Sequence, residues 1–68
     1  MKVTIGRCLL AERLAERGMS REKLAADLRM RPERIGDYID NKRIMPLKTA
    51  VAIARTIGCN TEELYEFE

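Results

Sequence analysis

The chain has 68 residues, a length that supports one modest hydrophobic core, so we expect residues 1–68 to form a single domain. Hydrophobic residues make up 46% of the chain and charged residues 35%, a mixture that is typical of a soluble globular domain and excludes a disordered tail. The formal net charge of +2 is too small to identify a nucleic-acid partner by itself, but residues 1–43 hold eleven Lys and Arg against seven Asp and Glu, so the basic side is N-terminal.

The sequence contains no His, and its two cysteines, Cys8 and Cys59, have no Cys-x-x-Cys spacing. We therefore predict no metal and no other cofactor. Both cysteines are expected to be free thiols that pack as small hydrophobic residues in a reducing, cytoplasmic setting, with a disulfide bridge as the alternative.

The sequence also disfavours a membrane protein and an enzyme. No apolar run approaches the ~18 residues that a transmembrane helix requires, so no membrane partner is expected. The chain has no His, no Gly-rich phosphate loop and no room for a pocket of the usual ~300 Å³ or more, so we expect neither catalysis nor a small-molecule ligand.

Four Gly and two Pro divide the chain into segments of helical length, which predicts an all-α fold. The first helix is expected over about residues 6–17, where Leu10 and Leu14 lie four residues apart and Gly18 follows the last turn. The second helix opens at Ser20, whose hydroxyl can cap a free backbone N–H. Its apolar face consists of Leu24, Ala25 and Leu28.

A tight turn separates the second helix from a third, which starts at Pro32 and runs to about Asp40. Asn41 tolerates the left-handed conformation and is expected to end this helix. The inward side chains recur at spacings of three and four residues, as Ile35, Tyr38 and Ile39.

A fourth helix is predicted from Pro46 to the residue before Gly58, with an apolar stripe formed by Leu47, Ala50, Val51, Ala54 and Ile57. Asn60 and Glu63 then have the spacing of a capping box, which predicts a short fifth helix. The predicted core of the five helices consists of Leu10, Leu14, Leu24, Leu28, Ile35, Val51, Ala54 and Leu64.

Two short helices joined by a turn, with basic residues at the start of the second helix and in the loop after it, have the organisation of a helix-turn-helix DNA reader. The stretch ERGMSREKLAADLRMRPERIGDYIDNKR also resembles the phage-repressor and Cro-like helix-turn-helix proteins, the xenobiotic-response-element (XRE) family. The stretch LKTAVAIARTIGCNTEELYEF resembles the family's fourth and fifth helices. This resemblance implies a compact five-helix, lambda-repressor-like DNA-binding domain with the helix-turn-helix at about residues 20–40.

Three arginines depart from the family pattern. Arg21 stands where the family commonly has a Gln that contacts the DNA backbone, and an Arg can still pair with phosphate. Arg29 replaces the usual turn Gly, at a cost of about 1–2 kcal/mol if the left-handed conformation is kept. Arg31 replaces a capping Ser or Thr and places a positive charge at a helix N-terminus, where the dipole disfavours it. A residue that is poor for the fold and good for phosphate indicates a functional role.

The resemblance implies a sequence-specific regulator of transcription that binds double-stranded DNA, acts as a repressor and inserts its third helix, about residues 31–40, into the major groove. The candidate base-reading residues are Arg31, Pro32, Glu33, Arg34 and Asp37. The candidate phosphate contacts are Arg21, Lys42 and Arg43. Gly36 removes side-chain bulk midway along this face, which would allow close approach to DNA.

Glu33 and Asp37 keep other interpretations open, because two acids on the reading face repel phosphates. The main alternative is a repressor-like protein-interaction module, such as an antitoxin or antirepressor, that binds its partner through the third or the C-terminal helix. A charged helix that is only solvated is a further alternative. The C-terminal helix is also a candidate homodimer contact through Leu64, Tyr65 and Phe67.

Overall fold

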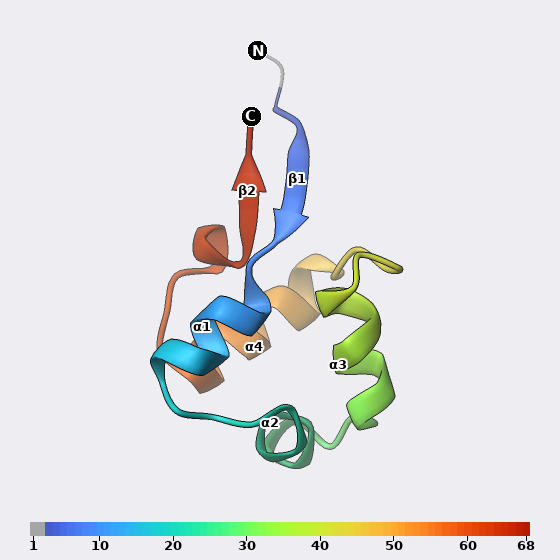
Figure 1. Cartoon of the computed structure of the whole chain (residues 1–68), viewed down its shortest axis with the longest axis vertical. Coiled ribbons are helices and arrows are strands. Elements are labelled where there is room, and N and C mark those ends of the chain that lie inside the picture. Colours follow the sequence, from blue (N-terminus) through green and yellow to red (C-terminus); the bar gives the residue numbers. More distant parts are fainter. Residues whose placement is uncertain (1–2) are drawn as a thin grey trace.

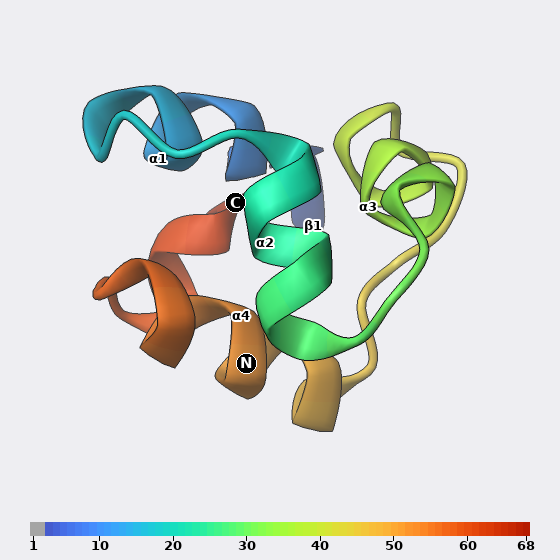
Figure 2. The same ribbon diagram turned by 90° about the horizontal axis from the view of Figure 1, so that it is seen from below.

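The computed structural model describes residues 3–68, which form a helical body from which a pair of short strands projects (Figure 1). The elements in chain order are β1 (Ile5–Cys8), α1 (Leu10–Glu16), α2 (Arg21–Leu28), α3 (Pro32–Ile39), α4 (Leu47–Ile57), the 3-10 helix η1 (Thr61–Leu64) and β2 (Tyr65–Phe67). Helix α2 packs against both α3 and α4, and α3 lies at the edge of the body in Figure 1 and in Figure 2. Within residues 3–68, every helix falls short of the length and apolar character that crossing a bilayer requires.

The predicted fifth helix is wrong, and the fold is therefore not purely α-helical. After η1 the chain extends as β2, which pairs antiparallel with β1. Ile5 lies opposite Phe67 and Cys8 lies opposite Tyr65, with an irregularity in the register between these two pairs. The strand pair thus joins two segments that are about sixty residues apart in the sequence.

Backbone hydrogen bonding explains why an extended segment replaces the helix. A helix of only a few residues is marginal in water, because its end groups have no partner within the helix. In the strand pair, Thr4 and Glu68 instead exchange two backbone hydrogen bonds of 2.9 Å each. Gly6 permits the close approach of the strands, because a Cβ at this position would lie 3.1 Å from the carbonyl oxygen of Glu66.

The first helix begins later than predicted, because β1 takes its expected first turn and α1 starts at Leu10. The other helix boundaries agree with the sequence signals. The hydroxyl of Ser20 caps α2, and Pro32 is the first residue of α3. Asn41 and Gly58 follow α3 and α4 in the left-handed region, with φ of 61° and 89°.

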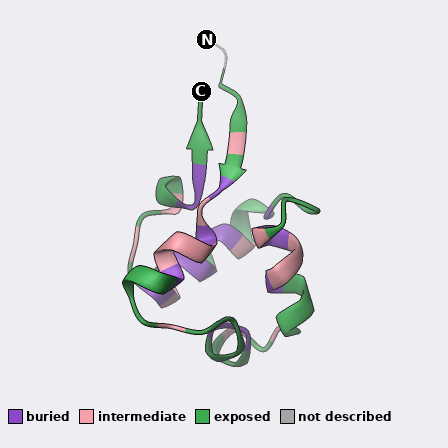
Figure 3. Ribbon diagram, viewed as in Figure 1, coloured by how far each residue is buried: buried purple, intermediate pink, exposed green. Residues whose placement is uncertain are grey.

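Six of the predicted core residues are buried: Leu10, Leu14, Leu24, Ile35, Ala54 and Leu64. Leu28 and Val51 are only half-buried. The inward face of α4 is rotated relative to the prediction, because Ile53 is completely buried whereas Leu47 is 77% exposed. Figure 3 shows this burial along each helix, and the core also includes Cys8, Tyr38, Met45, Ala50, Ile57 and Tyr65.

Burial of the C-terminal segment corrects the predicted homodimer contact. Leu64 and Tyr65 belong to the core of their own chain, with 0% and 8% exposure, so they are not available to a partner. Phe67 is 48% exposed and is the one member of the predicted set that lies on the surface.

The two cysteines are free thiols in the structure, Cys8 buried and Cys59 half-buried. Burial raises the pKa of both thiols, because the thiolate loses solvation.

Candidate nucleic-acid interface

The turn between α2 and α3 keeps the left-handed conformation although it carries an arginine. Arg29 has φ of 56° and ψ of 43°, a conformation that costs an L-residue about 1–2 kcal/mol. Backbone hydrogen bonds stabilise the turn, since the N–H groups of Arg29 and Met30 donate to the carbonyl groups of Ala26 and Ala25 at 3.2 and 2.9 Å. Arg31 is the N-cap residue of α3, and its side chain makes no capping hydrogen bond. The turn therefore presents two exposed guanidinium groups that do not stabilise the local fold.

Two buried side chains fix the rotation of α3 on the helical body. Ile35 is 0% exposed and Tyr38 is 2% exposed, so Tyr38 is a core residue, as predicted. The opposite face of α3 consequently points to solvent. The predicted base-reading residues on or beside this face are exposed, apart from the half-buried Asp37: Arg31, Pro32, Glu33, Arg34 and Asp37.

A surface depression of about 590 Å³ lies between α3, the turn before it and the α3–α4 loop (residues 40–46), so the expectation that the chain has no room for a hollow of this size is wrong. Its lining consists of Met30, Arg31, Glu33, Arg34, Asp37 and Arg43. Four predicted base-reading residues and one predicted phosphate contact are thus brought together, while Pro32 and Lys42 are exposed outside the lining. Met30 was missed as part of this surface, and its place in the turn next to Arg31 is the only signal for it in the sequence.

Asp37 and Arg43 form an ion pair across the depression, with 3.3 Å between Arg43 Nε and Asp37 Oδ2. The main chain of Asp37 also holds the loop, because its carbonyl oxygen accepts hydrogen bonds from the N–H groups of Lys42 and Arg43 at 2.9 and 3.3 Å. A predicted base reader and a predicted phosphate contact are therefore bound to each other within the protein. The Asp37 carboxylate is partly neutralised by this pairing, which leaves Glu33 as the acid in the depression without an ion pair among residues 3–68.

Arg21, at the start of α2, reaches across to α3. Its Nη1 atom lies 3.5 Å from the position that a Cβ on Gly36 would occupy. The missing side chain at Gly36 thus makes room for this guanidinium group, a contact that was not predicted from the sequence. Through this contact the exposed Arg21 side chain lies beside the middle of α3.

A family profile described as helix-turn-helix matches residues 9–64 of the chain, a range that includes α1 to α4 and η1. The chain belongs to the helix-turn-helix family. The chain is also similar to the SPbeta prophage-derived uncharacterized HTH-type transcriptional regulator YopS of Bacillus subtilis (strain 168). The two sequences are 32% identical over 69 residues, a match that covers 100% of this chain and 93% of the relative. The predicted resemblance to XRE-type helix-turn-helix proteins is thereby confirmed.

Cations outnumber acids on and beside α3 in this helix-turn-helix protein, although Glu33, Asp37 and Asp40 lie there too. Arg21, Arg31, Arg34 and Lys42, which lie on or beside α3, form no ion pair within the described residues. Four acidic residues lie instead on η1, β2 and the residue after it, away from α3 in Figure 1: Glu62, Glu63, Glu66 and Glu68. These four cations and the paired Arg43 outnumber the three acids of the same region, so a polyanion would be attracted to the second helix of the motif.

Proposed function

We propose that this helix-turn-helix protein is a sequence-specific regulator of transcription, a repressor that inserts α3 and the turn before it, about residues 31–40, into the major groove of double-stranded DNA. The observation that carries the proposal is the excess of exposed cations on and beside α3, on a chain of the helix-turn-helix family. We further propose that residues 1–68 act as one domain without catalytic activity. We place the protein in the cytoplasm, because that is where such a regulator meets DNA.

Phosphate contacts would hold the protein on the duplex. Double-stranded DNA carries about one negative charge per 1.7 Å of its axis, so cations on both sides of a groove-bound helix gain most from neutralising it. Lys42 and Arg43 lie in the loop after α3, whereas Arg21 lies at the start of α2 and beside Gly36. These three side chains are proposed to bind phosphates and to fix the register of α3, without reading sequence.

Base contacts would come from the N-terminal half of α3 and from the turn before it. Arg31 and Arg34 have the guanidinium geometry that pairs with guanine, and Glu33 is able to accept a hydrogen bond from the amino group of cytosine. Pro32 offers an apolar contact for a thymine methyl group. Asp37 would have to give up its pairing with Arg43 before it could contact a base, so its contribution to specificity is coupled to that of Arg43.

The alternative function is a protein-interaction module such as an antitoxin or antirepressor, and Glu33 is the feature that favours it. An exposed acid at the start of α3 repels phosphate groups, but it would suit a basic protein partner. A salt-dependent affinity for a DNA duplex separates the two functions, because a protein-interaction module would show no such affinity.

A homodimer remains part of the proposal, with its contact revised to the exposed Phe67 and to Ile5, which lies opposite it in the strand pair. Two copies related by a two-fold axis would read half-sites about one helical turn apart.

Selection of bound sequences from a random duplex pool tests the proposed function. A DNA reader is expected to enrich one motif, and a dimer would enrich a palindrome. No enrichment over several rounds at low salt would contradict sequence-specific binding and favour the protein-interaction alternative.

A further inference from the structure

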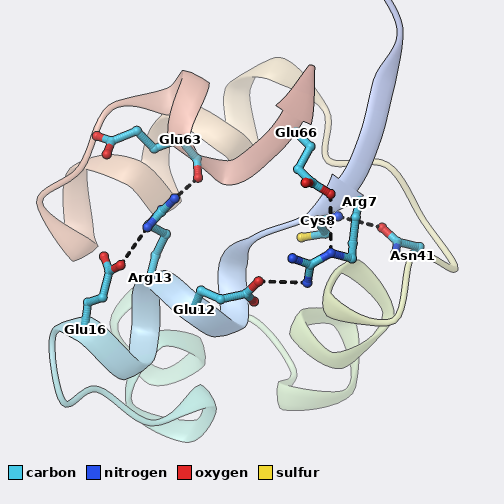
Figure 4. A network of polar contacts seen from close by, with 8 residues as sticks. All are labelled: Arg7, Cys8, Glu12, Arg13, Glu16, Asn41, Glu63 and Glu66. Atoms are coloured by element: carbon cyan, nitrogen blue, oxygen red, sulfur yellow. Dashed lines mark hydrogen bonds and ion pairs between the residues drawn. The ribbon is translucent and has the colours of Figure 1, made fainter. Parts of the chain in front are cut away.

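Two hydrogen bonds attach the α3–α4 loop to the strand pair, one at each end of its exposed middle. The N–H of Cys8 donates to Oδ1 of Asn41 at 3.0 Å, and the N–H of Met45 donates to the hydroxyl oxygen of Tyr65 at 3.0 Å. Figure 4 shows the side chain of Asn41 directed at β1 beside Cys8. Cys8 and Tyr65 are partners in the strand register, so both attachments meet at one point of the strand pair.

The residues between the two attachments are the proposed phosphate contacts. Lys42 and Arg43 are exposed, and so is Ile44, whereas the Met45 side chain is 6% exposed and anchors the far end of the loop in the core. Asn41 adopts a left-handed conformation at φ of 61°, which is the backbone geometry that sends the chain from α3 into the loop.

The strand pair is itself fixed to the helical body. Arg7 of β1 forms ion pairs of 2.7 Å with Glu12 of α1 and 3.3 Å with Glu66 of β2 (Figure 4). The N–H of Leu9 donates to the carbonyl oxygen of Leu64 at 2.7 Å, directly below the strands. The strand pair is therefore held against the helical body and is able to act as a fixed support for the loop.

We infer that the β1–β2 strand pair positions the α3–α4 loop on DNA, with Asn41 and Tyr65 as positioning residues that hold Lys42 and Arg43 in place for the phosphate backbone. The inference rests on the proposed function, since it assigns a role in DNA binding to residues that touch no DNA. Its physical basis is preorganisation: a loop that is held before binding loses less conformational entropy when its side chains reach the phosphates.

The test compares two variants that each remove one attachment. Tyr65→Phe removes the hydroxyl and keeps the buried ring, and Asn41→Gly removes the side-chain oxygen while allowing the left-handed backbone. Each is expected to weaken binding to a selected duplex and to a scrambled duplex alike, by about 2- to 10-fold, the range of one hydrogen bond. The matched control is Thr56→Val, which removes a hydroxyl that donates to the carbonyl of Ala52 on α4 and is expected to leave the affinity unchanged.

A double-mutant cycle separates positioning from a general loss of stability. If Tyr65 acts through the loop, Tyr65→Phe adds less than about 2-fold once Lys42→Ala and Arg43→Ala are present, because the side chains that it positions are gone. An equal loss in both backgrounds would overturn the inference. Hydrogen exchange of the free protein gives a second readout, in which Tyr65→Phe is expected to speed exchange at Met45 while leaving α1 protected.

The failure of this inference is distinguishable from failure of the proposed function. Wild-type protein that binds a duplex, with Tyr65→Phe and Asn41→Gly binding equally well, would overturn the positioning role and leave DNA binding intact. Wild-type protein that binds no duplex at low salt would remove the proposed function and this inference together.

Discussion

Replacing Asp37 with asparagine is expected to strengthen binding to any DNA duplex. Asp37→Asn keeps the side-chain size, and it leaves the main-chain oxygen that accepts from the N–H groups of Lys42 and Arg43, so the loop keeps its shape. The substitution removes a negative charge from the proposed DNA surface and releases the Arg43 guanidinium from its 3.3 Å ion pair. Arg43 then reaches a phosphate without first breaking an internal contact.

The exposure of the pair sets the magnitude. With side chains that are 57% and 35% exposed, the Arg43–Asp37 ion pair is screened by solvent and contributes at most about 1 kcal/mol. The affinity for a scrambled duplex is therefore expected to rise by up to about 5-fold. One more neutralised phosphate would steepen the slope of log affinity against log salt by about 0.9.

The assay is titration of Asp37→Asn and wild type against a selected and a scrambled duplex at two salt concentrations. Asp40→Asn is the matched control, because it removes an exposed carboxylate near the same loop that has no ion-pair partner among residues 3–68. An Asp37→Asn protein that binds the scrambled duplex no better than wild type, with the same salt slope, would refute the claim that Asp37 keeps Arg43 from a phosphate. Loss of about 1–3 kcal/mol on the selected duplex alone would identify Asp37 as a direct base contact instead.

Three further predictions concern the fold and the division of labour on the proposed surface. Leu24→Ala is expected to lower the free energy of unfolding by about 2–5 kcal/mol, because Leu24 is completely buried, and an unchanged melting temperature would contradict its core position. Lys42→Ala is expected to weaken binding to every duplex alike and to reduce the salt slope by about one unit, whereas Arg34→Ala is expected to relax preference at one or two base pairs. If both variants weaken binding to the selected and the scrambled duplex equally, the division into phosphate and base contacts is contradicted. Burial raises the pKa of the Cys8 thiol and of the Tyr65 hydroxyl, so the stability that their protonated forms contribute is fully present at neutral pH and is lost as the pH rises through the raised pKa values. Alkaline denaturation that begins at the same pH in a Cys8→Ala, Tyr65→Phe variant would contradict the role of these two groups.

Local signals in the sequence predicted most helix boundaries. Ser20, Pro32 and Gly58 each act through their own backbone or side chain within a few residues of the helix end, so their effect is readable without tertiary structure. The capping box of Asn60 and Glu63 is also present as predicted. That signal marks where a helix starts and carries no information about its length, and here it opens only the single 3-10 turn of η1.

Contacts between distant segments account for what the sequence did not reveal. The extended state of residues 65–67 depends on β1, about sixty residues earlier, and no local pattern encodes that pairing. The rotation of α4 was misjudged because Val51 and Ile53 are both apolar and only the packing of neighbouring elements selects Ile53. The pairing of Asp37 with Arg43 likewise depends on how the α3–α4 loop folds back, so two candidates that had been assigned separate roles are partners.

The candidate surface itself was largely predictable, because helical periodicity is a short-range property. Once Ile35 and Tyr38 are assigned to the core, the residues on the opposite side of α3 follow from the spacing alone. The contact of Arg21 with α3 at Gly36 required the crossing of two helices, and the attachment of Asn41 to β1 required the strand pair. Both are tertiary features, and both concern how the cations are held rather than which cations are present.

The measurement that tests the central claim most directly is the salt dependence of binding to a selected duplex. With Arg21 and Lys42 as phosphate contacts, and Arg43 as a third once it leaves Asp37, log affinity is expected to fall linearly with log salt at a slope of about −2 to −3. The selected duplex is expected to bind more tightly than a scrambled one at every salt concentration. Binding that is independent of salt, or no binding to any duplex at low salt, would contradict the assignment of α3 and its surrounding cations to DNA.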